Sequence, residues 1–449
     1  MGGSENALNR VSPFVRFLAR TACRLFYRVD CVGSPPESGA ALLLPNHPNA
    51  LLDPAVIWAT AGRDVRFLAK STLFDGPLRP LVAGSGAIPV YRRLDQGVDV
   101  SKNTETFAAV DAALADQDAI CIFPEGVSHS TGRLVPLRTG AARMTLSAER
   151  AGTRVNLVPV GLNFERKTTF RSRVTVIYGQ PFTGGDLADG TAHPDGVREL
   201  TDRIAARMRR LLIEAESKTD VAIVERVDRM YSAARGIGRD PHERVERRRI
   251  IAAGIERLRA ADPQRYDEIL LRFHRYQNRL ERFGLRDRHL DWTISKADAA
   301  TFAVREGLAA IVFGPLALVA LALFAVPYHL TGYAARWFTR EPDVAATAKV
   351  VGGFLIYAAW LLAIGISAWA AGVPHAVLLS VVFLPILAIA GLFAVERESA
   401  VIDAVRAWWV LTRTRADTRE RLRRRRSELA DILDEVNSWL MEKTENAEC

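Results

Sequence analysis

Short apolar runs alternate with longer segments of helical periodicity through the first half of the chain. The apolar runs are predicted to be strands, at residues 41–44, 65–68, 87–90, 119–123, 155–162 and 174–178. The segments with a helical pattern lie at residues 54–61, 77–84, 102–115, 137–150 and 196–217. This alternation is typical of an α/β fold, in which helices flank a mostly parallel sheet. Ligand sites in such folds collect at the carboxyl ends of the strands.

This α/β region spans residues 35–217, and the segments before and after it are predicted to be helical. Within residues 1–34, positions 8–29 combine an apolar stripe with regularly spaced arginines. Such an amphipathic helix either packs on its own domain or lies in a membrane interface, and the pattern leaves both interpretations open. Residues 218–300 are highly charged and predict a helical extension that carries no recognisable chemistry.

Two long stretches then contain no charged residue, at positions 307–328 and 350–395. A membrane crossing needs about 20 apolar residues, so we predict a membrane-embedded region over residues 301–400. Pro315 and Pro327 interrupt the first stretch, which is expected to lie shallow in the membrane or to re-enter it. The second stretch is long enough for a spanning hairpin, formed by residues 350–371 and 373–395.

The last segment, residues 401–449, is predicted to be an arginine-rich helix. It carries eight arginines between positions 413 and 426, in a chain with a net charge of +9. A net positive charge alone fits nucleic acid, a membrane surface or phosphorylated substrates. Arginines beside apolar segments more often meet lipid headgroups, so no nucleic-acid partner is expected. They also predict that this end, together with the α/β domain, lies on the cytoplasmic side of a membrane.

A histidine and an aspartate follow the first predicted strand of the sheet, at His47 and Asp53. With Asn49 as the helix N-cap, Asp53 lies in the first helical turns and can reach the imidazole. A carboxylate on one ring nitrogen fixes the tautomer and makes the other nitrogen a general base. A lone histidine after a strand is more often a structural hydrogen-bonding group, but the nearby carboxylate favours a catalytic pair.

Two arginines, Arg92 and Arg93, follow the strand predicted at 87–90. Guanidinium groups bind phosphate in a bidentate manner, so this pair is a candidate phosphate clamp. The alternative is ordinary surface charge. Lys70, which follows the strand at 65–68, is a weaker candidate for the same pocket.

The segment after the strand at 119–123 reads Phe-Pro-Glu-Gly-Val-Ser and supplies Glu125, Gly126 and Ser128. These residues are candidates for contact with an acceptor hydroxyl and for close approach of the backbone to a substrate. A hydrolase nucleophile elbow would need glycine at position 130, where this chain has serine, which argues against Ser128 as a nucleophile. His129 is expected to form local hydrogen bonds, since no metal-binding motif accompanies it.

In this order, with the proline-containing run at residues 158–162 as the fourth block, these residues resemble the glycerophospholipid (lysophospholipid) acyltransferase superfamily. The branch that looks most similar contains the glycerol-3-phosphate and dihydroxyacetone-phosphate acyltransferases. Two features depart from the common family pattern. Five residues separate His47 from Asp53 instead of four, and Val127-Ser128-His129 replaces the usual Thr-Arg-Ser.

The resemblance implies an O-acyltransferase of phospholipid biosynthesis. His47, oriented by Asp53, would take the proton of an acceptor hydroxyl, which then attacks the thioester of acyl-CoA or acyl-carrier protein. The acceptor would be glycerol-3-phosphate or 1-acyl-glycerol-3-phosphate, with its phosphate held by the two arginines and its glycerol part by Glu125 and Gly126. No cofactor or metal is expected, and the partners are membrane lipids and these substrates. A hydrolase of lipid esters or thioesters and a non-catalytic membrane-remodelling protein are the alternatives.

Overall fold

The chain folds into two compact units. The computed structural model describes residues 11–75, 79–92, 95, 98–187, 194–215, 218–238, 240–292, 296–338, 344–373, 375–413 and 416–448. The first unit comprises Met1–Glu225, Arg239–Ala253 and Glu341–Thr347, and the second comprises Arg226–Gly238, Gly254–Arg340 and Ala348–Cys449.

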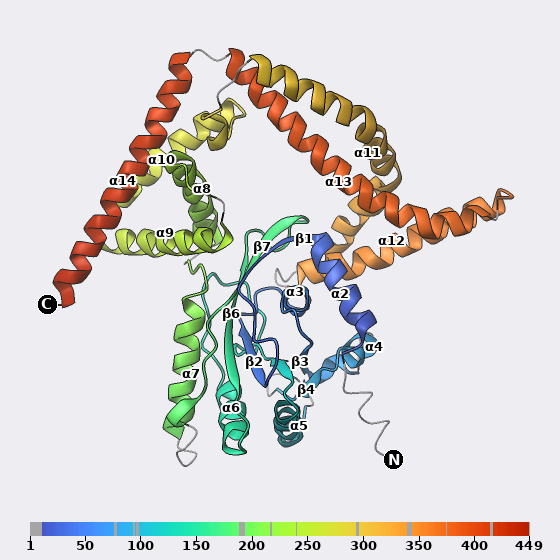
Figure 1. Ribbon diagram of the computed structural model, residues 1–449, viewed down its shortest axis with the longest axis vertical. Helices are drawn as coiled ribbons and strands as arrows, with labels where there is room; N and C mark the ends of the chain where they lie inside the picture. The colour runs from blue at the N-terminus through green and yellow to red at the C-terminus, as the bar shows by residue number, and fades with distance from the viewer. Residues whose placement is uncertain are drawn as a thin grey trace. The chain divides into compact units, whose positions relative to one another are not determined.

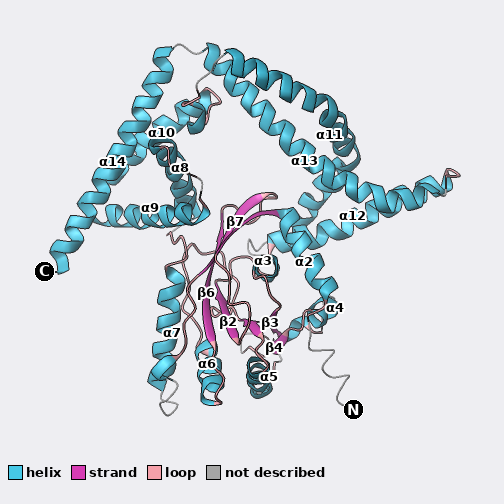
Figure 2. Ribbon diagram, in the orientation of Figure 1, coloured by secondary structure: helices cyan, strands magenta, loops and turns pink. Residues whose placement is uncertain are grey.

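A seven-stranded sheet forms the centre of the first unit (Figure 2). Its strands are β1 (Tyr27–Val32), β2 (Ala41–Pro45), β3 (Val65–Lys70), β4 (Ile88–Val90), β5 (Ala119–Cys121), β6 (Asn156–Phe164) and β7 (Ser172–Tyr178). They are arranged in the order β1-β7-β6-β2-β5-β3-β4. Neighbouring strands are parallel except for β6 and β7, which are antiparallel. The predicted fold class, a mostly parallel sheet with flanking helices, is therefore confirmed.

The helices of this unit are α2 (Pro13–Phe26), α3 (Leu52–Thr60), α4 (Arg79–Gly84), α5 (Asn103–Ala115), α6 (Gly140–Arg150) and α7 (Pro194–Arg209). Short 3₁₀ turns lie at Ser71–Leu73, Val100–Lys102 and Gly185–Leu187. All five residues of β2 are buried, as expected for a central parallel strand. Leu42 and Leu44 of this strand share one hydrophobic cluster with α5, α6 and α7. This buried cluster supports the loops that follow the strands.

The N-terminal helix ends earlier than the periodicity predicted. Helix α2 stops at Phe26, and Tyr27–Val32 forms edge strand β1, paired in parallel with β7. The cause is visible in the residue types: Tyr27, Val29 and Cys31 alternate with polar residues, which is a strand period. Helix α2 packs against α3 of the same unit, while Phe14 and Phe17 remain mostly exposed. Its placement in a membrane interface stays a prediction, and residues 8–10 lie outside the described residues.

The charged extension consists of helices, as its pattern indicated. They are α8 (Lys218–Arg235), α9 (Pro241–Ala261) and α10 (Pro263–Arg282), followed by a 3₁₀ turn at Asp287–His289. In the second unit, α10 packs against α14 (Ala416–Glu448), the arginine-rich helix (Figure 1). Arg426 of α14 is buried there and forms a bidentate ion pair with Asp291, at 2.7 and 2.5 Å.

The apolar region forms three long helices, α11 (Lys296–Phe338), α12 (Ala345–Ala370) and α13 (His375–Arg413). Helix α11 continues through Pro315 and Pro327, where the sequence had suggested an interruption. Helices α11 and α13 pack closely, since a Cβ at Gly391 would lie 2.1 Å from the Cβ of Ala320. In the described part of the chain, Phe313–Trp337 and Ala345–Ala370 are long and apolar enough to cross a membrane. Which segments cross stays a prediction.

Candidate active site

The two central sequence blocks of the site follow neighbouring parallel strands, β2 and β5. Leu43 of β2 is in register with Cys121 of β5. His47 and Glu125 each lie four positions beyond this pair. Because the strands run parallel, both loops leave the sheet at the same edge, and the main-chain N–H of His47 donates to Glu125 Oε1 at 2.7 Å. The predicted meeting of these two blocks is thus present in the structure.

His47 and Asp53 form a hydrogen-bonded pair. Asp53 Oδ2 lies 2.8 Å from His47 Nδ1, and it also accepts the main-chain N–H of Asn49 at 2.7 Å. The Asp53 side chain is fully buried, whereas that of His47 is 19% exposed. The ring of Phe123 stacks on the imidazole, with centroids 3.9 Å apart and planes inclined by 19°. These contacts fix the orientation of the ring, while Nε2 accepts no hydrogen bond from the described residues.

Burial raises the pKa of the Asp53 carboxyl above its ordinary value. The neighbouring groups act in the opposite direction. Hydrogen bonds from His47 and Asn49, and the positive charge of Lys167, each lower this pKa. A buried carboxylate held in this way stabilises a protonated imidazole beside it, which is what a histidine base requires when it accepts a proton.

The loop between His47 and Asp53 differs from the prediction in one respect. Helix α3 begins at Leu52 with no side-chain cap, so Asn49 is not its N-cap. Instead, Asn49 donates its side-chain amide to the hydroxyl of Tyr27 at 2.7 Å. The backbone N–H of Asn49 donates to the Asp53 carboxylate, and this hydrogen bond closes the loop. Ala50 takes a left-handed conformation, with φ of 45°, where the loop turns.

Asn46 anchors the start of the same loop to β6. Its side-chain amide donates to the carbonyl of Leu162 at 3.2 Å and accepts the Leu162 N–H at 2.7 Å. Strand β2 ends at Pro45, so this amide provides the next pair of hydrogen bonds to β6 where backbone pairing has ended. The fourth sequence block, at the end of β6, therefore has a structural role in placing His47.

Glu125 is buried, and both of its carboxylate oxygens have protein partners. Oε1 accepts from His47, and Oε2 accepts the N–H of Val135 at 3.3 Å and bonds Nε2 of His129. His129 in turn bonds Thr131 through Nδ1 and donates its main-chain N–H to the His47 carbonyl, at 2.6 and 3.1 Å. The expected local hydrogen bonding of His129 is present. These bonds connect the His47 loop to residues 125–135.

Ser128 and Gly126 also lie in this network. The Ser128 hydroxyl accepts the main-chain N–H of Ala50 at 3.0 Å, which fixes the turn of the His47 loop. Gly126 has a φ of +72°, and a Cβ at this position would lie 3.2 Å from Cγ of Arg138. The positive φ favours glycine here, and a Cβ would also require the Arg138 side chain to shift.

One of the two predicted arginines, Arg92, contacts the loop that contains Gly126. Arg92 Nη1 donates to the carbonyl of Gly126 at 2.9 Å, and Nε and Nη2 form a bidentate pair with Asp95 at 3.0 and 2.7 Å. The Arg92 guanidinium lowers the pKa of Asp95, with a smaller contribution from the charge of Lys70. Arg93 lies outside the described residues. The structure therefore brings Arg92 and Lys70 to this side of the site, and phosphate binding by them stays a prediction.

Two contributors to the site were not predicted from the sequence. Lys167, in the connection between β6 and β7, donates to the carbonyl of Pro48 and to the Ser130 hydroxyl, the latter at 2.7 Å. Tyr27 accepts from Asn49 and donates to the main-chain carbonyl of Lys167. Neither residue stands near a recognisable motif, so only the folded chain brings them to the His47 loop.

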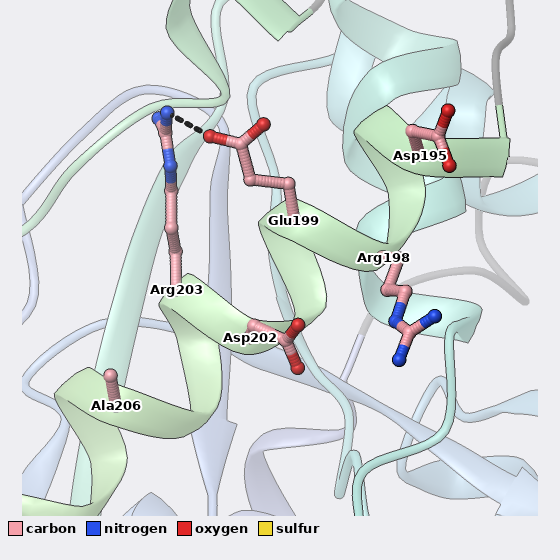
Figure 3. Close-up of a pocket in the computed structure, with 6 residues that line it drawn as sticks. All are labelled: Asp195, Arg198, Glu199, Asp202, Arg203 and Ala206. Atoms are coloured by element: carbon pink, nitrogen blue, oxygen red, sulfur yellow. Dashed lines mark hydrogen bonds and ion pairs between the residues drawn. The ribbon is translucent and has the colours of Figure 1, made fainter.

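A hollow of about 560 Å³ lies elsewhere in the first unit, along α7 (Figure 3). Its lining residues all belong to this one helix: Asp195, Arg198, Glu199, Asp202, Arg203 and Ala206. Glu199 and Arg203 form an ion pair one turn apart. Such i,i+4 pairs are typical of a solvated helix face, and none of the residues belongs to the His47 network, so we assign no chemistry to this hollow.

The site thus combines an oriented imidazole, a fixed backbone loop and an arginine on a neighbouring loop. Comparison with known proteins agrees with this arrangement, because residues 28–163 match the model of the Acyltransferase family. The matched region covers less than half of the chain. It contains His47, Asp53, Arg92 and Glu125.

Two yeast proteins are among the relatives. Glycerol-3-phosphate O-acyltransferase 2 of Saccharomyces cerevisiae is 29% identical over 191 residues, which are 41% of this chain and 25% of that protein. Glycerol-3-phosphate O-acyltransferase 1 is 32% identical over 125 residues, or 26% of this chain and 16% of that protein. The matches thus span a quarter or less of the yeast proteins. The crystal structure of a 1-acyl-sn-glycerophosphate acyltransferase from Thermotoga maritima shares 18% identity with a TM-score of 0.34, covering 46% of this chain and 81% of that one.

Proposed function

We propose that the chain is a membrane-associated O-acyltransferase of phospholipid synthesis. It would move a fatty acyl group from acyl-CoA or acyl-carrier protein to a hydroxyl of a glycerophosphate. The observation that carries this proposal is the 2.8 Å contact of His47 Nδ1 with the buried Asp53, inside the region that matches the Acyltransferase family. The names of the two yeast relatives make glycerol-3-phosphate the acceptor that we favour over its 1-acyl form.

In the proposed mechanism, Nε2 of His47 accepts the proton of the acceptor hydroxyl as its oxygen attacks the thioester carbonyl. The tetrahedral intermediate then collapses, the C–S bond breaks, and the departing thiolate takes the proton from the imidazolium. Asp53 stabilises the imidazolium between these steps. The acyl group passes directly to the acceptor, so the mechanism contains no acyl-enzyme intermediate and needs no metal.

Arg92 and Arg93 would hold the acceptor phosphate, with Lys70 adding positive charge nearby. Arg92 is paired with Asp95, and a phosphate would compete with that carboxylate for the same guanidinium fork. The role that we assign to Glu125 is to position His47, because protein groups bond both of its oxygens. Gly126 and Ser128 shape the backbone beside the imidazole.

Membrane association is supported by the exposure of the apolar helices. Only 22% of the most apolar 18-residue stretch of Phe313–Trp337 is buried within the protein. For the corresponding stretch of Ala345–Ala370 the buried share is 6%. Helices in the core of a soluble protein bury such residues. The exposed apolar side chains of these two helices therefore suit a lipid bilayer. The arginines of residues 413–426 would keep the C-terminal end, and with it the catalytic unit, on the cytoplasmic side.

The test is an assay of the purified full chain in a neutral detergent with palmitoyl-CoA and radiolabelled glycerol-3-phosphate. Thiol release and label in the lipid extract are measured together, and 1-acyl-glycerol-3-phosphate and dihydroxyacetone phosphate are compared as acceptors. We expect equal amounts of thiol and lipid product, and a loss of roughly a thousandfold or more in His47→Ala. His242→Ala is the control, because His242 is an exposed histidine of α9.

Two results would contradict the proposal. Loss of thioester without an acceptor would indicate a hydrolase. Absence of any acyl transfer, together with full rescue of a deletion strain by His47→Ala, would indicate a non-catalytic membrane protein.

A further inference from the structure

A cavity in the second unit is lined by arginines from two helices. It has a volume of about 350 Å³ and lies between the last turn of α10 and the first turns of α14. Arg279 and Arg282 come from α10, and Arg421 and Arg425 come from α14. Its lining contains no carboxylate. Four positive charges around one cavity therefore have no anionic group within it.

Three other arginines of α14 have carboxylate partners. On α14, Arg424 pairs with Glu428 at 3.3 Å, and Arg423 and Arg426 both pair with Asp291. Among the residues that the structure describes, none of the four arginines of the cavity forms an ion pair. Arg421 donates to the Thr418 hydroxyl at 3.2 Å, so the positive charge of the cavity meets a neutral group and no carboxylate.

The position of the cavity on the helices adds to this positive potential. Helix α14 begins at Ala416, so Thr418 and Arg421, which line the cavity, lie in its first two turns. The N-terminal end of a helix carries partial positive charge and favours anions. This effect falls off within the first turn, so it acts at Thr418 rather than at Arg421. The two arginines of α10 lie at a helix C-terminus, where cations are favourable, so the excess arises on α14.

Two further lining residues are apolar. Leu422 of α14 is 3% exposed, and Phe283 at the end of α10 is 38% exposed. Guanidinium groups match phosphate oxygens geometrically, and aliphatic or aromatic side chains match the organic part of a phosphate ester. The volume is within the range of small-ligand sites.

We propose that this α10–α14 pocket binds a phosphate ester, supplied either by an anionic lipid headgroup or by a soluble phosphorylated molecule. The proposal does not depend on the acyltransferase function, because none of its residues belongs to the His47 network. The four arginines lie around one small hollow, which suits a single phosphate group better than a nucleic-acid backbone, since the latter needs an extended basic stripe.

The experiment measures binding by isothermal titration calorimetry, with the full chain in a neutral detergent at constant salt. The probes are sodium pyrophosphate, dioctanoyl-phosphatidylglycerol and the zwitterionic dioctanoyl-phosphatidylcholine. The pocket variant is Arg279→Gln with Arg421→Gln. The control variant is Arg272→Gln with Arg424→Gln, which removes the same charge from exposed positions of the same two helices outside the cavity.

We expect at least one of the two anionic probes to bind, with affinity lowered tenfold or more in the pocket variant and less than twofold in the control. Binding of pyrophosphate indicates a soluble ligand, and binding of phosphatidylglycerol alone indicates a lipid headgroup. Arg421→Lys keeps the charge but loses the guanidinium fork, so it should give an intermediate loss even if the double variant folds poorly.

Three results would overturn the proposal. They are failure of the wild-type chain to bind either anionic probe, equal weakening in the pocket and control variants, and displacement of the probe by a single-stranded oligonucleotide that binds more tightly.

Discussion

Glu125 holds the main chain of His47 rather than its side chain. Its Oε1 accepts the His47 N–H at 2.7 Å, and its Oε2 bonds His129 and the N–H of Val135. The carboxylate is 1% exposed and connects two loops that follow neighbouring strands. The acid of the Phe-Pro-Glu-Gly block therefore acts on the candidate base through the backbone.

Glu125→Gln tests this relationship. The side-chain amide of glutamine has one acceptor oxygen and one donor NH₂ group. One of the N–H groups that donate to the Glu125 carboxylate would therefore face this NH₂ group. We expect kcat to fall about tenfold to a hundredfold, while KM for glycerol-3-phosphate stays within about twofold, since one hydrogen bond to a charged group is worth about 1.5–3 kcal/mol. Steady-state kinetics measure both constants. Glu105→Gln, at an exposed position of α5, is the control, and a rise in KM at constant kcat would instead indicate direct contact with the acceptor.

Gly126→Ala should destabilise the protein more than Gly152→Ala does. Both glycines have positive φ, +72° and +87°, so both variants incur the conformational cost of about 1–2 kcal/mol. Only at Gly126 does the new Cβ meet a neighbour, Cγ of Arg138 at 3.2 Å, whereas Gly152 has open space. The difference in Tm between the two variants isolates the crowding. Equal Tm values would show that Arg138 moves away at no cost.

Lys167→Met should shift the pH dependence of activity. The positive charge of Lys167 lowers the pKa of Asp53, which burial raises, so its removal should raise that pKa further. Activity requires the ionised carboxylate, and we therefore expect the acidic limb of the kcat/KM profile to move to higher pH. The variant also loses the bonds to Pro48 and Ser130, and we expect kcat to fall about tenfold at neutral pH.

The profile is recorded between about pH 5 and 9, which is about two pH units on either side of neutrality, alongside Lys102→Met as an exposed control. A lower kcat without displacement of the acidic limb would mean that Lys167 acts only through its hydrogen bonds.

Stability of the second unit should decrease in acid because of His289. Its side chain is buried, and burial, followed by the charges of Arg288 and Arg286, lowers its pKa to about 4. The unfolded chain binds this proton near the ordinary pKa of about 6.5, so between these values the unfolded state binds more protons and is favoured as pH falls. We expect Tm to decline between about pH 6.5 and 4, and the decline to be smaller in His289→Gln. His242→Gln, at an exposed site, should leave the slope unchanged.

The sheet could be predicted because its central strands are continuous apolar runs. Leu42, Leu43 and Leu44 are all buried, as expected for a strand in a sheet that is covered on both faces. The apolar run is also too short for a typical helix. Strand β1 was missed because the alternation of Tyr27, Val29 and Cys31 is short and directly follows a helical pattern. Its pairing with β7 shows that the strand period applies from Tyr27 onward.

Within the site, the sequence predicted the contact between His47 and Asp53 but not the contacts that hold their loop in place. The pairing of His47 with Asp53 followed from residue types and their distance along the chain. The partner of Asn49 could not be predicted, because Tyr27 belongs to a strand that the pattern had concealed. Lys167 reaches Pro48 across more than a hundred residues of sequence, and such contacts have no local signal.

The left-handed turn at Ala50 has a consequence for how related chains are recognised. With φ of 45° and its N–H held by Ser128, this residue lets a longer loop bring Asp53 within 2.8 Å of the imidazole. Counting intervening residues is therefore a poor criterion for homologues of this kind. A better one asks whether the loop contains a small residue able to reverse direction, and whether a hydroxyl on the adjoining segment is available to hold it there.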